Sequence, residues 1–357
     1  MAKLWLDCET FSAVPLNHGT AAYAAACEVM IITYALDDGP VRCWDRTLDP
    51  AWPEALYKLL HLDDSVEVWA HNSYFDRTVM GVNAPPIERW RCTLVMAYAH
   101  GLPGSLGKLG EILGLPEDQQ KMKEGKELIH LFCKPRPKNS ELRRATRHTH
   151  PEEWELFKQY AIRDTETMRT IGKLLPTWGY PNNRRELELW FLDQHINDRG
   201  IAVDVELARA AVRATKVAKA ALNEDTVRLT DDHVERATQR DKLLAYLLLE
   251  WGVDLPDMQA ATLELRLRDE NLPDALRELI AVRLQSSMTS QTKYQTALNA
   301  VSADGRVRGA LQFDGAQRTG RWAGRILQPQ NFVRPWLMQD EIDRGILALK
   351  LGVEGLL

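Results

Sequence analysis

The amino-acid sequence predicts an α/β domain with a mixed sheet and flanking helices, followed by a mostly α-helical region. Apolar, β-branched runs separated by turn residues dominate the chain before Thr93, and helical periodicity dominates after it. The order of three strands, a helix, a strand and then helices is typical of an α/β domain. A segment with two prolines and a glycine, residues 176–181, marks the boundary with the helical region.

The individual elements follow from local patterns. We expect strands over 3–7, 29–36, 41–44 and 66–70, and helices over 50–62, 151–175 and most of 184–301. Gly200 stands where a helix C-cap is expected, because glycine readily adopts the left-handed conformation that ends helices. Asp304 and Gly305 form a turn that opens a different segment.

The composition limits the class of protein. A chain of 357 residues, 45% hydrophobic and 27% charged, is typical of a soluble globular protein with two or three domains. No apolar run is long enough to span a membrane, no leader suggests secretion, and five cysteines lack CxxC spacing, so we expect a cytoplasmic protein with reduced thiols. The net charge of −5 argues against a simple nucleic-acid coat protein but does not exclude a nuclease, because local clusters matter more.

Acidic residues near the ends of two predicted strands form the first part of a candidate catalytic site. Asp7 and Glu9 lie two positions apart on the first strand, so both carboxylates point to the same side. Asp76 follows the fourth strand, in the first turn of a helix that we expect Asn72 to cap. In α/β sheets this strand edge is where sites form. Carboxylate oxygens are ligands for hard divalent cations such as Mg²⁺.

A tyrosine and a further aspartate complete the set. Tyr160 and Asp164 share one face of the long helix because their spacing is i, i+4. Hydrolysis of a phosphodiester by two divalent cations, Mg²⁺ or Mn²⁺, needs several carboxylates to hold the metals together, and a tyrosine hydroxyl beside them can orient water. Taken singly, Asp76 is explained as a helix-start charge, Tyr160 as packing and Asp164 as a solvated residue. Their joint occurrence on these elements favours a metal site.

Basic residues gather in two segments. Residues 134–150 hold two prolines and six basic residues against one glutamate, which predicts an exposed loop. This loop is either a solvated connection or a contact to DNA phosphates. Residues 304–336 hold six arginines, two aspartates and neither lysine nor glutamate, so this segment is also locally basic.

The acidic set resembles that of a known family. The patterns DxE at 7–9, NxxxD at 72–76 and YxxxD at 160–164 are similar to the proofreading 3′–5′ exonuclease domains of the DEDD superfamily, tyrosine subtype (DEDDy). Residues 90–98 and 104–114 resemble the helical stretch between the second and third motifs. The resemblance implies a ribonuclease H-like fold. It also implies that Asp7, Glu9 and Asp164 hold the metal at the attacking water. Asp7 would bridge to a second metal, which Asp76 supports partly through water. Tyr160 would orient the nucleophile.

The same resemblance implies contacts to the 3′ nucleotide. Thr10 and Asn72 match family positions near this nucleotide. Cellular family members place an apolar wedge four positions after the first glutamate, where this sequence has Ala13. Phe11 and Phe75 are candidates to replace the wedge, since aromatic faces stack on bases.

The second half resembles part of the family A DNA polymerases, the bacterial DNA polymerase I type. Residues 198–204 resemble the entry to the thumb, 286–298 a late thumb helix, and 304–331 the start of the palm. The tripeptide at 319–321 is the most specific part of this resemblance. In the family its arginine lies in the DNA minor groove near the primer end. The sequence of 318–325 is similar to that of phage and prophage members. The implied DNA contacts are Arg318, Arg321, Arg325, Gln330 and Asn331.

The resemblance implies three regions: a 3′–5′ exonuclease domain over 1–178, a helical thumb-like region over 179–301 and an incomplete start of the palm over 302–357. The implied partners are a single-stranded DNA 3′ end and a primer–template duplex, in proofreading during DNA replication, in a bacterial cell and from a phage or prophage. No palm aspartates or fingers helix follow in the sequence, so the chain corresponds to the front part of a polymerase and is not expected to extend a primer alone.

Two other interpretations stay open at the level of sequence. One is a stand-alone RNA-trimming exonuclease of the same superfamily, against which the palm-like segment argues. The other is a subunit that grips primer–template DNA for a separately encoded palm and fingers. The complete acidic set argues that the chain does more than bind.

Overall fold

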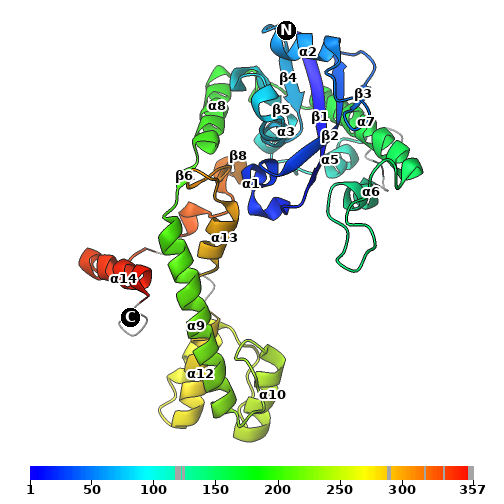
Figure 1. Cartoon of the computed structure of the whole chain (residues 1–357). Helices are drawn as coiled ribbons and strands as arrows, with labels where there is room; N and C mark the ends of the chain where they lie inside the picture. The colour runs from blue at the N-terminus through cyan, green and yellow to red at the C-terminus, as the bar shows by residue number, and fades with distance from the viewer. Residues whose placement is uncertain (117–121, 123–124, 288–290, 317–318, 333, 353–357) are drawn as a thin grey trace. The chain divides into compact units, whose positions relative to one another are not determined.

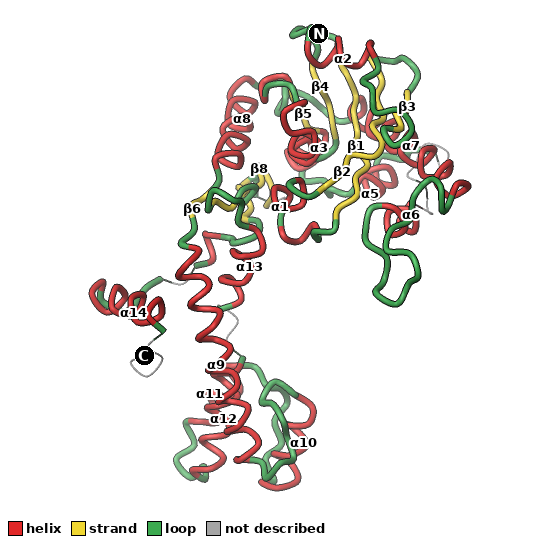
Figure 2. Tube along the Cα trace, in the orientation of Figure 1, coloured by secondary structure: helices red, strands yellow, loops and turns green. Residues whose placement is uncertain are grey.

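A five-stranded mixed sheet forms the centre of the N-terminal part in the computed structural model (Figures 1 and 2). The strands are β1 (Lys3–Ser12), β2 (Cys27–Leu36), β3 (Arg42–Asp45), β4 (Glu67–Ala70) and β5 (Trp90–Cys92), in the order β3-β2-β1-β4-β5. The β1–β2 and β2–β3 pairs are antiparallel, whereas β4 runs parallel to β1 and β5 parallel to β4. The four predicted strands and the mixed sheet are confirmed.

The fifth strand corrects the prediction that only helix follows the fourth strand in this domain. Trp90–Cys92 has three residues, all buried, and runs directly into helix α4. A strand of this length has no visible alternation, so its sequence resembles the start of the buried helix.

Helices surround the sheet and position its catalytic candidates. They are α1 (Thr20–Ala24), α2 (Glu54–His61), α3 (Ser73–Met80), α4 (Thr93–Ala99), α5 (Leu106–Ile112), α6 (Gly125–Phe132), α7 (Pro151–Leu174) and α8 (Arg184–Arg199). Helix α7 contacts β1, β2 and β3 and so lies across the sheet. One core cluster contains Trp5, Trp69 and Trp90, and a second gathers aromatic side chains of α6 and α7 around Tyr160. The predicted helix over 50–62 begins only at Glu54, because Pro53 occupies its N-cap.

Two compact units make up the described chain. Unit 1 is Met1–Val203 with Asn299–Phe332, and unit 2 is Asp204–Leu298 with Val333–Leu357. The structure describes residues 1–116, 122, 125–287, 291–316, 319–332 and 334–352. The predicted region limits at 178 and 301 differ from these units, because Trp190 of α8 and Phe313 belong to the core cluster that also contains the sheet residues. The assignment of the three regions to exonuclease, thumb and palm stays a prediction.

Short strands close unit 1. Strand β6 (Ile201–Ala202) pairs with β7 (Arg306–Val307), and β8 (Leu311–Ala316) pairs with β9 (Arg321–Gly324), all antiparallel. The sequence did not predict these strands, and β6 interrupts the stretch expected to be almost entirely helical. Gly200 ends α8 with a φ of 69°, as expected of a C-cap.

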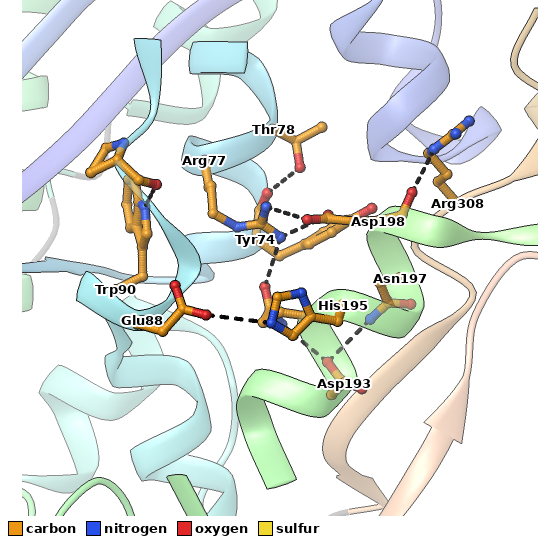
Figure 3. A network of polar contacts seen from close by, with 12 residues as sticks. Tyr74, Arg77, Thr78, Glu88, Trp90, Asp193, His195, Asn197, Asp198 and Arg308 are labelled. Carbon is orange, nitrogen blue, oxygen red and sulfur yellow. Dashed lines mark hydrogen bonds and ion pairs between the residues drawn. The ribbon is translucent and has the colours of Figure 1, made fainter. Parts of the chain in front are cut away.

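A polar network fastens α8 to its neighbours within unit 1 (Figure 3). Arg77 of α3 makes two hydrogen bonds to the carboxylate of Asp198, at 2.7 and 2.9 Å. Asn197 pairs with the backbone of Leu311, donating to its carbonyl and accepting from its amide. Helix α8 therefore joins α3, next to the catalytic candidates, to the β8–β9 hairpin.

Unit 2 is helical. Its helices are α9 (Val205–Leu229), α10 (Arg240–Trp251), α11 (Ala260–Leu267), α12 (Asp274–Ser286), the greater part of α13 (Thr292–Ala300), and α14 (Gln339–Leu351). Its core consists mainly of leucines of α10, α11 and α12, including Leu247, Leu263 and Leu279. In the part of the chain that the structure describes, no helix combines the length and the apolar character needed to span a bilayer.

Candidate active site

Strand β1 carries the first two carboxylates of the site. Asp7 lies opposite Thr33 and Glu9 opposite Ile31 in the β1–β2 ladder, with an irregularity between Glu9 and Thr10. A bulge at this position re-aims the residues beside it. Glu9 is buried and Asp7 half-buried, so the strand presents both groups with restricted access to water.

Helix α3 brings a third carboxylate against β1. Asp76 is 1% exposed, and its Oδ1 accepts a hydrogen bond from the Cys8 amide at 3.1 Å. Burial raises the pKa of Asp76 well above its ordinary value, and the negative charge of Asp7 raises it further. Asp7 and Asp76 are therefore close enough to repel one another in a poorly solvated place.

The predicted cap of α3 needs correction. Asn72 occupies the N-cap, but its backbone is left-handed, with a φ of 70°, and its side chain makes no capping hydrogen bond. The side chain of Asn72 is exposed. It thus remains accessible to a ligand.

Helix α7 contributes the tyrosine and the fourth carboxylate. Tyr160 and Asp164 are both buried. Burial is the largest cause of a raised pKa at the Tyr160 hydroxyl, followed by the negative charges of Asp164, Glu9 and Asp7, with a hydrogen bond to Asp164 as well. Tyr160 therefore lies near carboxylates of both β1 and α7.

Buried contacts hold α7 in this register. The Thr33 hydroxyl of β2 lies 2.7 Å from the Thr165 hydroxyl and 3.2 Å from the Ala161 carbonyl oxygen, to which it donates. Both α7 residues directly follow a member of the predicted catalytic pair, Tyr160 or Asp164. The strand that pairs with β1 thereby sets the position of both side chains.

Three residues near the site escaped the sequence analysis. A Cβ added to Gly125 of α6 would lie 2.2 Å from Cε2 of Tyr160, so only glycine leaves room for the ring. The Cys133 thiol donates to Glu9 Oε2 at 3.8 Å, and burial followed by the charge of Glu9 raises its pKa. Cys8 lies between the β1 carboxylates, and its pKa is also raised, first by burial. No spacing rule marks such residues in a sequence.

The donor set fits a hard cation chemically. All four acidic candidates offer oxygen ligands, and a divalent cation would relieve the repulsion that raises the pKa of Asp76. Among the residues that the structure describes, no three His, Cys, Asp or Glu side chains form a ready-made metal cage.

The residues predicted to contact a 3′ nucleotide differ in how far they are buried. Thr10 is buried, and its hydroxyl lies 2.7 Å from that of Tyr23. Phe75 is half-buried, and the centre of its ring lies 5.7 Å from that of the Tyr23 ring. Ala13 is exposed just beyond the end of β1. Phe11 is half-buried and packs against the aromatic cluster that includes Tyr160.

The predicted duplex contacts lie on and after strand β9. Arg321 and Arg325 are exposed, and Arg325 donates to Gln312 Oε1 of the facing strand. Gln330 and Asn331 follow in a short 3₁₀ helix, Pro329–Asn331. Arg318 lies outside the described residues.

A cavity of about 660 Å³ within unit 1 is lined by one residue from each predicted set of DNA contacts, Asn72 and Arg325. Asn72 lines one part of it, and Gln312 and Arg325 line another. Buried polar side chains of α8, including Asp193, complete the lining. The acidic set itself does not appear in this lining as far as the described residues go.

Comparison with known proteins identifies relatives of the whole chain. A DNA polymerase of Bacillus phage SP02 is 35% identical over 361 residues, which covers 99% of this chain and 54% of the phage protein. The solved structure of the POL domain of Pol1 from M. smegmatis, in complex with DNA primer-template and dNTP, has a TM-score of 0.53 and 16% identity, covering 92% of this chain and 53% of that one. No protein-family model matches.

These comparisons cover this chain almost completely, although it spans only about half the length of the proteins it matches. The likeness to the mycobacterial structure concerns the fold alone, because the identity is low. The match to the phage polymerase spans both units, including the stretches that hold the acidic residues and the segment around 319–321. This chain is therefore similar over almost its whole length to a phage DNA polymerase, and it shares its fold with the POL domain of Pol1.

Proposed function

We propose that this chain is a metal-dependent 3′–5′ exonuclease that removes nucleotides from DNA 3′ ends, as the proofreading portion of a family A DNA polymerase. The observation that carries the proposal is the convergence of β1, α3 and α7 on one place. There, beside the effect of burial, the negative charges of Asp164, Glu9 and Asp7 raise the pKa of the Tyr160 hydroxyl. The charge of Asp7 likewise adds to the effect of burial on the pKa of Asp76. In this proposal residues 1–178 form the exonuclease domain, 179–301 the thumb-like region and 302–357 the start of the palm.

The four carboxylates would hold two divalent cations. Asp7, Glu9 and Asp164 would bind one cation, and Asp7 with Asp76 the other. Bound there, Mg²⁺ or Mn²⁺ supplies an activated water and stabilises the charge that develops on phosphate and leaving oxygen. Burial of Glu9, Asp76 and Asp164 supports this role, because charges removed from water attract a cation more strongly.

Tyr160 would act as a hydrogen-bond donor. Its raised pKa keeps the hydroxyl protonated at any physiological pH, so it does not serve as a base. A protonated hydroxyl fixed between Asp164 and Glu9 orients the attacking water rather than removing its proton. The close approach of Gly125 to the ring supports a positioning role.

The second part of the proposal is binding of a primer–template duplex. The mycobacterial relative in fold was solved with DNA primer-template, and this chain places exposed Arg321 and Arg325 on β9 and just after it. Arg318, Gln330 and Asn331 would add to this surface. The cavity between Asn72 and Arg325 supports a connection between duplex binding and the 3′ end.

A labelled DNA strand tests the proposal. Wild-type chain with Mg²⁺ or Mn²⁺ should shorten a 5′-labelled single strand stepwise from its 3′ end, and excess EDTA should stop it. Asp7→Ala and Asp164→Ala should abolish cleavage while DNA binding remains. Full activity in EDTA, or in both variants from preparations free of host nuclease, would reject the proposal. Parallel reactions with RNA and with paired primer–template separate DNA proofreading from RNA trimming and from binding alone.

A further inference from the structure

The basic loop over 134–150 is fastened along the end of strand β1. The Ser12 amide donates to the Cys133 carbonyl oxygen at 3.4 Å, and the Arg136 amide to that of Arg143 at 2.9 Å. Ala145 is buried in the cluster that includes Tyr160. The loop, which joins α6 to α7 (Figure 1), is therefore held beside the acidic site.

One arginine of this loop lies over an aromatic ring of β1. The guanidinium carbon of Arg144 is 4.0 Å from the centre of the Phe11 ring. Its Nη1 donates to Glu28 Oε2 at 2.7 Å. Glu28 is the residue opposite Phe11 in the β1–β2 ladder, so Arg144 covers a cross-strand pair. Phe11 itself is two residues beyond Glu9 on β1.

The pairing with Glu28 leaves the Arg144 side chain partly exposed. A guanidinium that lies flat on a ring keeps its N–H groups in its own plane, where they can bind a phosphate with two hydrogen bonds. Glu28 takes Nη1, and Nε of Arg144 is buried without a hydrogen-bond partner among the described atoms, so a phosphate would be bound through Nη1 and Nη2. The ion pair is partly exposed, 31% for Arg144 and 51% for Glu28, so it holds only weakly against a competing anion.

The neighbouring charges favour such an anion. Arg143 and Lys138 are exposed and Arg147 is half-buried in the same loop. A single DNA strand whose 3′ end entered the acidic site would carry phosphates past the end of β1, where Phe11 and Arg144 lie. The negative carboxylates repel this strand, so a nearby cation of the protein would offset that repulsion.

We propose that Arg144 is a substrate-binding residue that exchanges Glu28 for a backbone phosphate of the single strand, while Phe11 holds its guanidinium in place. This proposal rests on the proposed exonuclease function and deepens it by naming how the strand is gripped. It also gives Glu28 a role, as the internal partner that occupies the arginine until DNA arrives.

Two variants distinguish phosphate binding from a merely structural ion pair. Arg144→Ala removes both interactions, whereas Glu28→Gln removes only the ion pair and leaves the arginine unopposed. If Arg144 binds phosphate, R144A should weaken binding of a short fluorescein-labelled single strand by about 10- to 150-fold, as expected when a charged hydrogen bond is removed. E28Q should bind as tightly as wild type or tighter. Arg144→Lys, which keeps the charge but loses the two-bond geometry, should be intermediate.

The experiment measures fluorescence anisotropy in EDTA, so that binding is read without metal or cleavage, over a series of salt concentrations. The slope of log affinity against log salt should flatten by about 0.7 in R144A, the value for one phosphate contact to a single strand. Arg184→Ala is the matched control, because Arg184 is an exposed arginine of unit 1 that also pairs with a glutamate. It should leave affinity and slope unchanged.

Either of two results would overturn the proposal: R144A binding like wild type, or E28Q weakening binding as much as R144A, which would make the ion pair structural. If R144A does not fold, R144K and E28Q carry the same comparison. Failure of the exonuclease proposal looks different, because then wild type would not cleave with Mg²⁺ whatever the binding data show. With cleavage intact, R144A should raise KM and leave kcat within about 2-fold, since uniform binding is removed.

Discussion

The carboxylate of Asp193 accepts a hydrogen bond of 2.7 Å from the indole Nε1 of Trp322, 129 positions further along the chain. Asp193 also accepts bonds from Gln194 and Asn197, and the same Gln194 side chain accepts one from Arg77 of α3. Trp322 lies on β9 beside Arg321. One helix, α8, thus fixes the strand predicted to meet duplex DNA and the helix that carries Asp76.

Trp322→Phe should loosen the β8–β9 hairpin. The substitution removes the indole donor and leaves a buried carboxylate oxygen of Asp193 without it, at an expected cost of about 1–3 kcal/mol. Hydrogen exchange of the β8 and β9 amides should accelerate by about 10-fold or more. Trp178→Phe, at a tryptophan 75% exposed in unit 1, is the control and should change nothing. Unchanged exchange in W322F would mean that the indole bond does not hold the hairpin.

The stability of unit 1 should depend on pH through Asp193. Burial raises its pKa from 3.8 to about 6 despite three hydrogen bonds that lower it. Between about pH 4 and 6 the folded protein then holds a proton that the unfolded chain has lost, so this group's contribution to stability falls as pH rises, by about 2–3 kcal/mol. Asp193→Asn cannot titrate, so the melting temperature of wild type relative to D193N should decline across this window. A difference independent of pH contradicts the raised pKa.

Tyr160→Phe should slow cleavage by about 10- to 1,000-fold, because the hydroxyl positions the nucleophile. Metal dependence should barely change, since the hydroxyl is not expected to coordinate. Single-turnover rates on a labelled strand measure the effect, with Tyr57→Phe on the exposed side of α2 as control. Wild-type rates for Y160F would reduce Tyr160 to packing.

Gly125→Ala should impair cleavage without touching any carboxylate. The new methyl group would lie 2.2 Å from the Tyr160 ring and force it to move. A displacement near 1 Å in an active site can cost about 100-fold in rate. Gly107→Ala on α5 is the matched control, because nothing lies within 4 Å of its added Cβ. Equal single-turnover rates for G125A and wild type would show that the ring is not positioned through this contact.

Replacing Arg318, Arg321 and Arg325 together by alanine should weaken primer–template binding. The slope of log affinity against log salt should flatten by up to about 0.9 for each duplex phosphate that the protein no longer neutralises. Arg321 adds little to this change if it reads the minor groove. Cleavage of short single strands should survive, because the acidic set lies on other elements, and Arg184→Ala again serves as control. Unaltered duplex affinity and slope would remove these arginines from the DNA-binding surface.

Local sequence patterns predicted most of the sheet. Strands β1 and β2 are long apolar runs, and α7 and α8 have clear periodicity and sharp ends. Strands β5, β6 and β7 have two or three residues and carry no measurable alternation. Their pairing depends on partners far away in the sequence, such as Ile201 with Val307, which no local rule predicts.

In the candidate site, too, the sequence predicts contacts within one element but not contacts between elements. Spacing placed Asp7 with Glu9 and Tyr160 with Asp164, since each pair lies on a single element. Local patterns carry no sign that Cys133 and Gly125 pack against members of these two pairs, because those contacts arise only when α6 packs on α7 and β1. The side chain of Asn72 does not cap α3 because its backbone is left-handed.

The β6–β7 pairing places the segments before and after residues 204–298 side by side. The chain leaves unit 1 after Val203 and returns at Asn299, and the Val203 amide donates to the Gly305 carbonyl oxygen at 3.0 Å. Residues 204–298 are thus an insertion whose two attachment points are held together by hydrogen bonds within unit 1. Closing a longer loop costs only slightly more entropy. Helices can therefore be added to or deleted from this insertion during evolution while the distance between its two attachment points stays the same. The acidic residues, which lie in unit 1, are then not displaced.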